Sequence, residues 1–373
     1  MMTTEPIVAL LVHGGPDSVE AARARGLASK HPPDKVSLLF REGSRWSTAG
    51  RWSRELERIS PGLLYVINTA MPGALLACWW RRRHRVPFVL DTGDVVYEMA
   101  RSSGITPAWK WPALKVVEAL AQRMAHTIVV RGVKHAEYLR QKGHERVALI
   151  RDGYQTKDAP SPVIVEALRK RLGLADKFVV GIMGSLVFSP RLGICYGWDL
   201  IEALAELRDL PIQGLIIGDG NGEAWLRRRA GELGVAERVT FCGRIPYEEV
   251  SAYLRLMDVA LSTQTNNLPG QVRTTGKLPE YMAAGRFILA SRVGDAAVLL
   301  PETMLLDFAG EVDREYPRKL AARLRLLWRD RTILEARQTL PAMAAENCSY
   351  EVLSKKFNAV VAGITARQGN DEG

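Results

Sequence analysis

The sequence lacks the marks of a secreted, membrane-spanning or zinc-binding protein. Its cysteines, Cys78, Cys195, Cys242 and Cys348, are scattered and form no C-x-x-C pair. A zinc site or a disulfide framework is therefore not expected, and the chain fits a reducing cytoplasm. No window approaches about 18 uncharged apolar residues, so the sequence predicts no membrane-spanning helix. The N-terminus, MMTTEPIVALLVHGG, lacks the basic region and the long apolar core of a signal peptide.

The length and charge of the chain indicate two domains, one of them basic. A chain of 373 residues suggests two cores of up to about 200 residues each. Residues 1–170 contain 26 Lys and Arg against 16 Asp and Glu, whereas residues 171–373 contain 25 of each. The net charge of +10 therefore belongs to the first half. Such asymmetry is typical of a half that faces a polyanion: nucleic acid, an anionic membrane or a phosphorylated substrate.

Short apolar runs alternate with amphipathic stretches along the whole chain. The runs have the length of strands and are bounded by Gly or Pro, and the stretches between them have helical periodicity. This alternation predicts the α/β fold class, with two doubly wound Rossmann-like domains facing across a cleft. The expected strands are 7–13, 36–40, 63–67, 88–92, 127–130, 147–150, 178–184, 214–219, 239–243, 259–263 and 287–291.

Loops rich in Gly and polar residues follow five of the expected strands. In open α/β sheets a ligand binds at the carboxyl ends of the strands. Because such loops occur in both halves of the chain, they predict one ligand-binding cleft between the two domains. His13 ends the first strand, where it can contact a substrate; a strand-end histidine without a role is the alternative. The loops are HGGP (13–16), DTGD (91–94), MGSLVFSPR (183–191), GDGNG (218–222) and STQTNNLPGQVRTTGK (262–277).

The stretch TTGKLPEYMAAG (274–285) is expected to hold a phosphate and a sugar diol. Thr274, Thr275 and Gly276 leave backbone N–H groups free at the start of a helix, where the helix dipole favours an anion. Glu280 lies about one turn into the helix, where its carboxylate can accept hydrogen bonds from a diol. A capped helix in which Glu280 only complements the dipole is the alternative.

Several segments together resemble the retaining glycosyltransferases of family 4, which have the two-domain GT-B fold. IMGSL (182–186) and YGWDLIEAL (196–204) resemble the family's first C-domain strand, loop and helix. Residues 215–262 are similar to the family nearly element for element, and TTGKLPEYMAAGRFILASRVG (274–294) resembles its donor-binding signature. FVLDTGDVVYE (88–98) resembles the family's N-domain loop.

The resemblance implies an enzyme that moves a sugar from a UDP- or GDP-linked donor to an acceptor, with retention of configuration and without a metal. No cofactor besides the donor is implied. The acceptor would be a glycan or lipid-linked and would bind to the first domain, residues 1–165. The donor would bind to the second domain, residues 166–345. Residues 346–373 would form a helix that crosses back to the first domain and a frayed tail, GNDEG.

The resemblance also implies roles for individual residues. Glu280 would bind the ribose hydroxyls of the donor, and Asp94 would lie beneath the sugar near the acceptor. The implied catalytic residues are Asp94, Arg191 and Lys277, and no metal ligand is implied. The implied donor-binding residues are Gly14, Gly15, Gly184, Ser185, Gly243, Arg244, Ile245, Arg273, Thr274, Thr275, Gly276 and Glu280.

The chain departs from the family pattern at three positions. Ser185 stands where the family has an Arg, Tyr196 where it has a Lys, and Val272 where it has an earlier Glu. The Arg and Lys neutralise the diphosphate in the family. Either Arg191, Arg273 and Lys277 supply that charge here, or diphosphate binding is weak. The missing Glu normally touches the transferred sugar, so the resemblance does not fix the identity of the sugar.

Two clusters of Trp and basic residues in the first half predict a surface that docks on an anionic membrane. Tryptophan prefers the membrane interface, and arginine is attracted to anionic lipids. The alternative is a solvated basic face. We expect a cytoplasmic protein that is peripheral on the inner membrane face. The residues of the predicted surface are Trp79, Trp80, Arg81, Arg82, Arg83, Trp109 and Trp111.

Three other functions remain open from the sequence. A nucleotide-sugar epimerase or a sugar phosphorylase would share the fold, but the Lys-x-x-Glu-Tyr-Met-Ala signature (277–283) argues against both. A catalytically degenerate transferase that serves as a scaffold is suggested by the three departures. A nucleic-acid binder is suggested only by the basic half, which lacks a recognition motif, so no nucleic-acid partner is expected.

Overall fold

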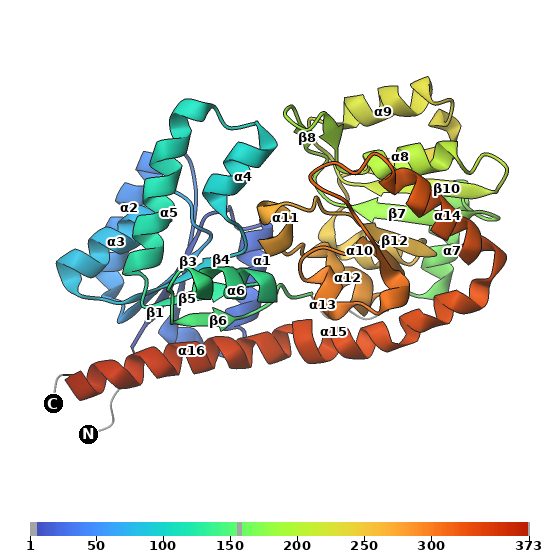
Figure 1. The fold of residues 1–373 in the computed structure, drawn as a ribbon. Coiled ribbons are helices and arrows are strands. Elements are labelled where there is room, and N and C mark those ends of the chain that lie inside the picture. The colour runs from blue at the N-terminus through green and yellow to red at the C-terminus, as the bar shows by residue number, and fades with distance from the viewer. Residues whose placement is uncertain (1–5, 155–158, 372–373) are drawn as a thin grey trace.

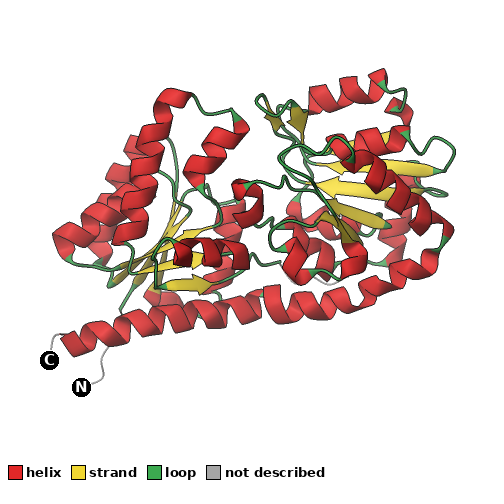
Figure 2. Ribbon diagram, viewed as in Figure 1, coloured by secondary structure: helices red, strands yellow, loops and turns green. Residues whose placement is uncertain are grey.

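The computed structural model describes residues 6–154 and 159–371, which form two α/β domains and a long C-terminal helix (Figure 1). The N-domain contains the first six strands and the C-domain contains the other eight. Helices cover both faces of each sheet, as Figure 2 shows. Because the main strands are parallel and buried on both faces, they are continuous apolar runs rather than alternating ones. The predicted fold class is confirmed.

The N-domain sheet has the strand order β2-β1-β3-β4-β5-β6, and all its pairings are parallel. Its strands are β1 (Val8–Val12), β2 (Val36–Phe40), β3 (Leu63–Ile67), β4 (Phe88–Thr92), β5 (Thr127–Val130) and β6 (Val147–Leu149). Its helices are α1 (Val19–Ala28), α2 (Arg45–Ile59), α3 (Gly73–His84), α4 (Val96–Ser103), α5 (Trp111–Met124) and α6 (Val133–Gln141), with the 3₁₀ turns η1 (Pro33–Lys35) and η2 (Ala108–Lys110).

The C-domain sheet has the order β11-β10-β7-β12-β13-β14. Its strands are β7 (Phe178–Met183), β10 (Ile212–Ile217), β11 (Val239–Gly243), β12 (Val259–Ser262), β13 (Phe287–Ser291) and β14 (Leu305–Leu306), and β8 (Phe188–Ser189) and β9 (Ile194–Cys195) form a separate hairpin. Its helices are α7 (Pro162–Arg171), α8 (Trp198–Ala205), α9 (Glu223–Glu232), α10 (Tyr247–Leu254), α11 (Leu268–Val272), α12 (Lys277–Ala283), α13 (Ala296–Leu299), α14 (Tyr316–Arg329) and α15 (Leu340–Cys348), with η3 (Ala236–Arg238), η4 (Glu302–Met304) and η5 (Arg331–Thr339).

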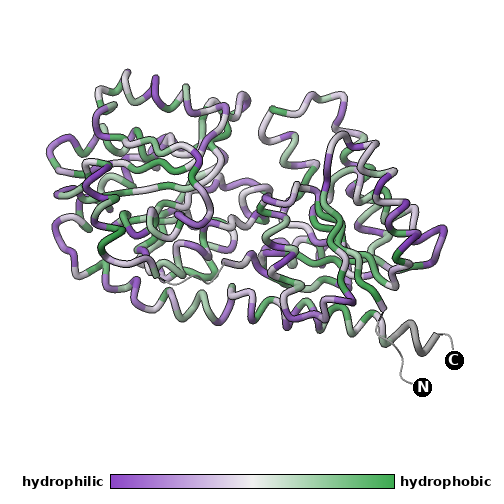
Figure 3. Tube along the Cα trace, turned by 180° about the vertical axis from the view of Figure 1, so that it is seen from behind, coloured by the Kyte–Doolittle hydropathy of each residue, from purple (hydrophilic) through white to green (hydrophobic). Residues whose placement is uncertain are grey.

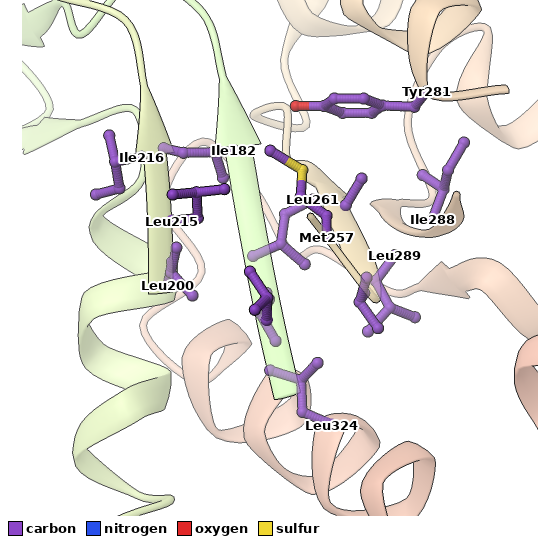
Figure 4. Close-up of a cluster of buried hydrophobic side chains, with 14 of the residues drawn as sticks. Ile182, Leu200, Leu215, Ile216, Met257, Leu261, Tyr281, Ile288, Leu289 and Leu324 are labelled. Atoms are coloured by element: carbon purple, nitrogen blue, oxygen red, sulfur yellow. The ribbon is translucent and has the colours of Figure 1, made fainter. Parts of the chain in front are cut away.

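Each domain is held by its own apolar core. The strands contribute many of the buried apolar residues, and hydrophobic segments of the chain trace run through both domains in Figure 3. In the C-domain, Ile182 and Leu215 from the sheet belong to the same buried cluster as Leu200 of α8 and Leu324 of α14 (Figure 4). The helices therefore pack on the sheet through the apolar side chains that their periodicity places on one face.

Helix α16 (Tyr350–Asp371) links the two domains along one side of the molecule (Figure 1). Its side chains Leu353 and Phe357 are fully buried and belong to the core of the N-domain, next to Tyr65. The first three residues of the predicted frayed tail, 369–371, belong to this helix, so that part of the prediction is wrong, and the last two residues lie outside the described residues. Among the described residues, no helix has the length and apolar character that a bilayer span requires.

Candidate functional site

The topological switch points of both sheets point at the space between the domains. The strand order reverses between β1 and β3 in the N-domain and between β7 and β12 in the C-domain. Ligands of such sheets bind outside the carboxyl ends of the strands at these points. The loops predicted from sequence all lie at these ends, since each follows its strand directly. The fold therefore concentrates them in one region.

Side chains of the two domains meet across this region. Arg273, which precedes α12, lies 3.3 Å from the carboxylate of Asp94, which follows β4. The hydroxyl of Thr274 donates to the carboxylate of Asp152 at 2.7 Å. Asp295 of the C-domain pairs with Arg151 and accepts from the backbone N–H of Val133 at 2.7 Å.

A small cavity opens where these contacts meet. Arg131, Arg151 and Asp152 line it from the N-domain, and Thr274 and Thr275 from the C-domain. Two of the predicted phosphate-binding residues therefore border a cavity that both domains build.

The loop after β7 is shaped by close backbone approach. The N–H of Gly184 donates to the carbonyl of Ile217 at 2.9 Å. A Cβ added to Gly218 would lie 2.0 Å from the carbonyl oxygen of Gly184, and both glycines have positive φ. Only glycine fits this contact, so the loops after β7 and β10 can touch directly. Ser185 is exposed at the edge of these loops.

Lys277 points at this loop from the first turn of α12. Its Nζ lies 3.5 Å from the centre of the Tyr196 ring and 3.4 Å from the position of a Cβ built on Gly184. Burial and, to a smaller extent, the positive charge of Arg273 lower the pKa of Lys277 to about 7, although Asp199 acts to raise it. Tyr196, the residue that replaces the family's lysine, thus supports an ammonium group that comes from a different helix.

Two hydrogen bonds fix the residues that surround Lys277. The Tyr196 hydroxyl donates to the carbonyl of Leu261 at 3.1 Å. The Thr263 hydroxyl donates to Asp199 at 2.5 Å. Burial raises the pKa of Asp199 although Thr263 and Lys277 act to lower it. Sequence reasoning missed Asp199; its place in the first turn of α8 after the glycine loop was the available signal.

Glu280 lies on the same helix, three residues beyond Lys277. Its carboxylate accepts a hydrogen bond from the hydroxyl of Tyr247, the first residue of α10. Gly243 ends β11 with φ of 65°, and its carbonyl accepts from the N–H of Gly218 at 2.8 Å. Arg244 is exposed, and the structure brings these residues to the same edge of the sheet. Sequence reasoning did not find Tyr247. Ile245 contacts the apolar core, and this contact fixes the turn that precedes Tyr247.

The N-domain loop HGGP makes a tight turn before α1. The hydroxyl of Ser18 donates to the carbonyl of Gly15 at 2.7 Å and accepts from Ala21 N–H at 3.1 Å as the N-cap of α1. A Cβ on Gly14 would lie 2.1 Å from the Ser18 oxygen, so the turn needs glycine there. The donor contacts predicted for Gly14 and Gly15 stay predictions.

Arg191 lies between the domains but is already occupied. Its Nε donates to the carbonyl of Ser102 at 2.6 Å, and its Nη2 lies 2.6 Å from Glu311. Ser189 adds a hydrogen bond from its hydroxyl to the carbonyl of Ser103 at 2.8 Å. In this structure Arg191 therefore joins the C-domain to the end of α4, and its predicted role at the diphosphate stays a prediction.

An ion network that sequence reasoning missed lies beneath the N-domain loops. Arg23 donates to both oxygens of the fully buried Asp91, and Tyr65 donates to the same carboxylate at 2.8 Å. Arg131 lies 3.2 Å from Asp91 and 3.4 Å from Asp152. Burial alone would raise the pKa of Asp91, but the two arginines hold it below its ordinary value. The feature of the sequence that could have indicated this network was Arg23, an arginine on the buried face of α1.

The predicted membrane surface is only partly exposed. Trp79 is 48% exposed and Trp109 is 77% exposed, and both stay candidates, together with the exposed Arg82 and Arg83. Trp80 is 2% exposed, because its indole packs in the core of the N-domain and stacks on the His84 ring, so the surface role predicted for it is wrong.

Two further members of that prediction are engaged inside the domain. Arg81 donates to the carbonyl of Met124, the last residue of α5. The half-buried Trp111 donates from its indole N–H to the carbonyl of Thr106 at 3.0 Å. Helix α5 also exposes two apolar side chains that were not part of the predicted surface, Val116 at 64% and Leu120 at 39%.

Within residues 6–154 and 159–371, no group of three or more His, Cys, Asp or Glu side chains could hold a metal ion.

Parts of the chain resemble known proteins in sequence. Residues 177–330 match the family model described as glycosyl transferases group 1. A segment of 158 residues is 39% identical to the GDP-mannose-dependent alpha-(1-6)-phosphatidylinositol monomannoside mannosyltransferase of Mycolicibacterium smegmatis and covers 41% of this chain and 39% of that protein. A segment of 139 residues is 31% identical to the 2-deoxystreptamine glucosyltransferase of Streptomyces kanamyceticus and covers 36% of this chain and 33% of that protein.

Solved structures resemble the chain over nearly its whole length. The HepE protein of Anabaena, crystallised with UDP-glucose, superposes with a TM-score of 0.77 at 17% identity, covering 96% of this chain and 100% of HepE. WaaG, a glycosyltransferase involved in lipopolysaccharide biosynthesis, superposes with a TM-score of 0.66 at 16% identity and covers 95% of this chain and 99% of WaaG. The GT-B fold is therefore confirmed, and residues 177–330 resemble the glycosyl transferases group 1.

Proposed function

We propose that this protein transfers a sugar from a nucleoside-diphosphate donor, bound by the C-domain, to an acceptor bound by the N-domain. The observation that carries the proposal is the position of Lys277 over Tyr196, with its ammonium group at the Gly184 loop. The family's lysine is missing from its usual place, and a cation from α12 lies above the residue that replaces it. The exposed edge of the same helix carries Glu280 for the ribose.

The chemistry requires little more than preorganised charge. The bond between C1 of the sugar and the diphosphate breaks through an oxocarbenium-like state, and a bond from C1 to the acceptor oxygen forms. Negative charge grows on the leaving diphosphate, where Lys277, Arg273 and the backbone N–H groups of residues 274–276 are proposed to stabilise it. The proton of the acceptor hydroxyl passes to the leaving phosphate oxygen on the same face, so the configuration is retained and no metal is needed.

The relatives support a nucleotide-sugar donor without fixing its base. The mycobacterial relative is named for GDP-mannose, and the HepE structure contains UDP-glucose. We therefore propose that the donor is a UDP- or GDP-linked hexose and that the protein uses no cofactor besides this donor. A glycan or a lipid-linked molecule is the proposed acceptor.

Docking on an anionic membrane is proposed for the outer face of the N-domain. Trp109, Val116 and Leu120 expose apolar area from η2 to the end of α5, and Arg82 and Arg83 are exposed on the adjacent α3. Apolar side chains beside basic ones suit the interface of a bilayer that contains acidic lipids. A peripheral position on the inner face would bring the cleft to lipid-linked acceptors.

Calorimetric titration of UDP and of GDP tests the donor site. We expect one nucleotide to bind the wild type and to bind at least about tenfold more weakly to Glu280→Ala, because the charge-assisted hydrogen bonds to the ribose are lost. Glu335→Ala is the matched control, since Glu335 is an exposed glutamate in η5. Absence of binding by both nucleotides would favour the scaffold instead.

A further inference from the structure

Polar and basic side chains gather where β1 and β2 of the N-domain end. The backbone N–H of Arg41 donates to the carbonyls of Val12 at 3.0 Å and Gly14 at 3.1 Å. Its guanidinium donates to Nε2 of His13 at 3.3 Å. These contacts fix the loop after β2 against the HGGP turn, so the start of α2 is held at the carboxyl edge of the sheet.

The charged groups of this cluster act on His13. Burial, Arg41 and Arg45 all lower the pKa of His13, and Glu20 opposes them. The imidazole is therefore neutral near pH 7, and both arginines face it as cations. Over residues 6–154 and 159–371, neither Arg41 nor Arg45 forms an ion pair. On the same helix Arg51, by contrast, pairs with Glu42 at 2.6 Å.

An aromatic side chain stands beside this charge. Trp46 follows Arg45 in the first turn of α2 and is 84% exposed, more than any other large hydrophobic side chain among the described residues. An indole that is 84% exposed contributes little to the core. It provides a flat face on which a sugar ring or an alkyl chain can pack.

The cluster shares its edge with the residues that face the donor. Asn68, which follows β3, donates to Glu20 at 3.2 Å and accepts from Arg131 at 2.7 Å. Arg131 reaches Asp152, which accepts from Thr274 of the proposed diphosphate site. A chain of contacts therefore runs from Glu20 in the first turn of α1 to the C-domain, and Glu20 acts electrostatically on His13.

We propose that Arg41, Arg45 and Trp46 form a subsite for the phosphate group of an anionic acceptor, with the adjoining sugar or alkyl group packed on the indole. The inference rests on the proposed function, in which the N-domain holds the acceptor. Two guanidinium groups recognise phosphate through charge-assisted and bidentate hydrogen bonds. Part of the excess positive charge of the first half of the chain would then lie at this subsite.

The test is titration of hexyl phosphate into the full chain saturated with whichever nucleotide binds it. Hexanol serves as the uncharged comparison. We expect Arg45→Gln and Trp46→Ala each to weaken hexyl phosphate binding by about tenfold, the effect of losing one charge-assisted contact or one packed aromatic face. Arg54→Gln, an exposed arginine of the same helix, is the matched control and should change nothing. Both test residues are exposed, so folding is preserved.

The outcomes separate the two proposals. If no nucleotide binds the wild type, the proposed function fails. If the nucleotide binds normally but hexyl phosphate does not, or if Arg54→Gln weakens it as much as Arg45→Gln, the subsite is overturned. Vesicles containing phosphatidylglycerol distinguish the source of the phosphate. Arg45-dependent binding to vesicles indicates a lipid headgroup, and Arg45-dependent binding of hexyl phosphate alone indicates a soluble acceptor.

Discussion

The ammonium group of Lys277 lies 3.5 Å from the centre of the Tyr196 ring. The two residues are 81 positions apart in the chain and come from α12 and from the loop before α8. The Tyr196 hydroxyl is fixed by the carbonyl of Leu261, so the ring is a rigid support. A cation over an aromatic face gains about 0.5–2 kcal/mol, depending on its desolvation. In the proposed function, Lys277 takes the place of the lysine that the family pattern has at the position of Tyr196.

The pKa of Lys277 predicts how nucleotide binding depends on pH. Because burial and Arg273 lower this pKa to about 7, the free protein loses the positive charge as the pH rises above about 7. The terminal phosphate of UDP or GDP, with a second pKa of about 6, is already ionised there. We therefore expect affinity to fall between about pH 7 and about pH 9 in the wild type.

Calorimetry across this range checks the prediction. In Lys277→Arg the affinity should stay level, because arginine keeps its charge. Lys355→Arg, on the exposed face of α16, should behave like the wild type. Equal slopes in Lys277→Arg and the wild type would show that another group titrates.

Asp295 is expected to stabilise the contact between the domains. It pairs with Arg151 and accepts from Val133 N–H, and its side chain is 5% exposed. Asp295→Ala leaves Arg151 without its partner, so we expect the free energy of unfolding to fall by about 3 kcal/mol. Urea unfolding measures this. Asp209→Ala, which removes an exposed pair with Arg325, should leave the stability unchanged, and an equal loss in both variants would contradict the interdomain role.

The lowered pKa of Asp91 predicts that the free energy of unfolding falls in acid. Its pKa in the folded protein is below the ordinary 3.8 because Arg23 and Arg131 outweigh burial. A carboxyl with a lowered pKa stabilises the fold above its ordinary pKa, and this stability is lost as the pH falls through the lowered value. Below about pH 4 the wild type should therefore lose stability more steeply than Asp91→Asn. Urea titrations at several acidic pH values compare the slopes; a steeper slope in the variant would reverse the assignment.

Membrane docking predicts different effects for an exposed and a buried tryptophan of the N-domain. Trp109→Ala, on the exposed surface, should weaken sedimentation with vesicles containing phosphatidylglycerol by about fivefold and leave stability unchanged. Trp80→Ala should instead lower the free energy of unfolding by about 3 kcal/mol, because Trp80 is buried. Val163→Ser, at an exposed site on α7, is the control for vesicle binding. Unaltered sedimentation of Trp109→Ala would rule out this face.

The sequence predicted the two sheets because buried parallel strands are continuous apolar runs, such as β1 and β13, and their order along the chain requires crossover helices. It missed β14, which has two residues and no periodicity. Trp80 was misassigned because adjacent tryptophans lie on different sides of a helix, and only packing decides which one is buried. The partners of Asp91 came from α1 and from the end of β5, a pairing that depends on the tertiary fold.

The most direct test of the central claim is to measure turnover by NMR in the wild type and in Lys277→Met. The donors are UDP-glucose and GDP-mannose, and the acceptors are a mixture of phosphorylated and unphosphorylated sugars. The account predicts that the wild type releases nucleoside diphosphate from one donor, that the new glycosidic bond has the configuration of that donor, and that Lys277→Met is about 100-fold slower. Turnover in Lys277→Met at the rate of the wild type would contradict the role of the relocated lysine.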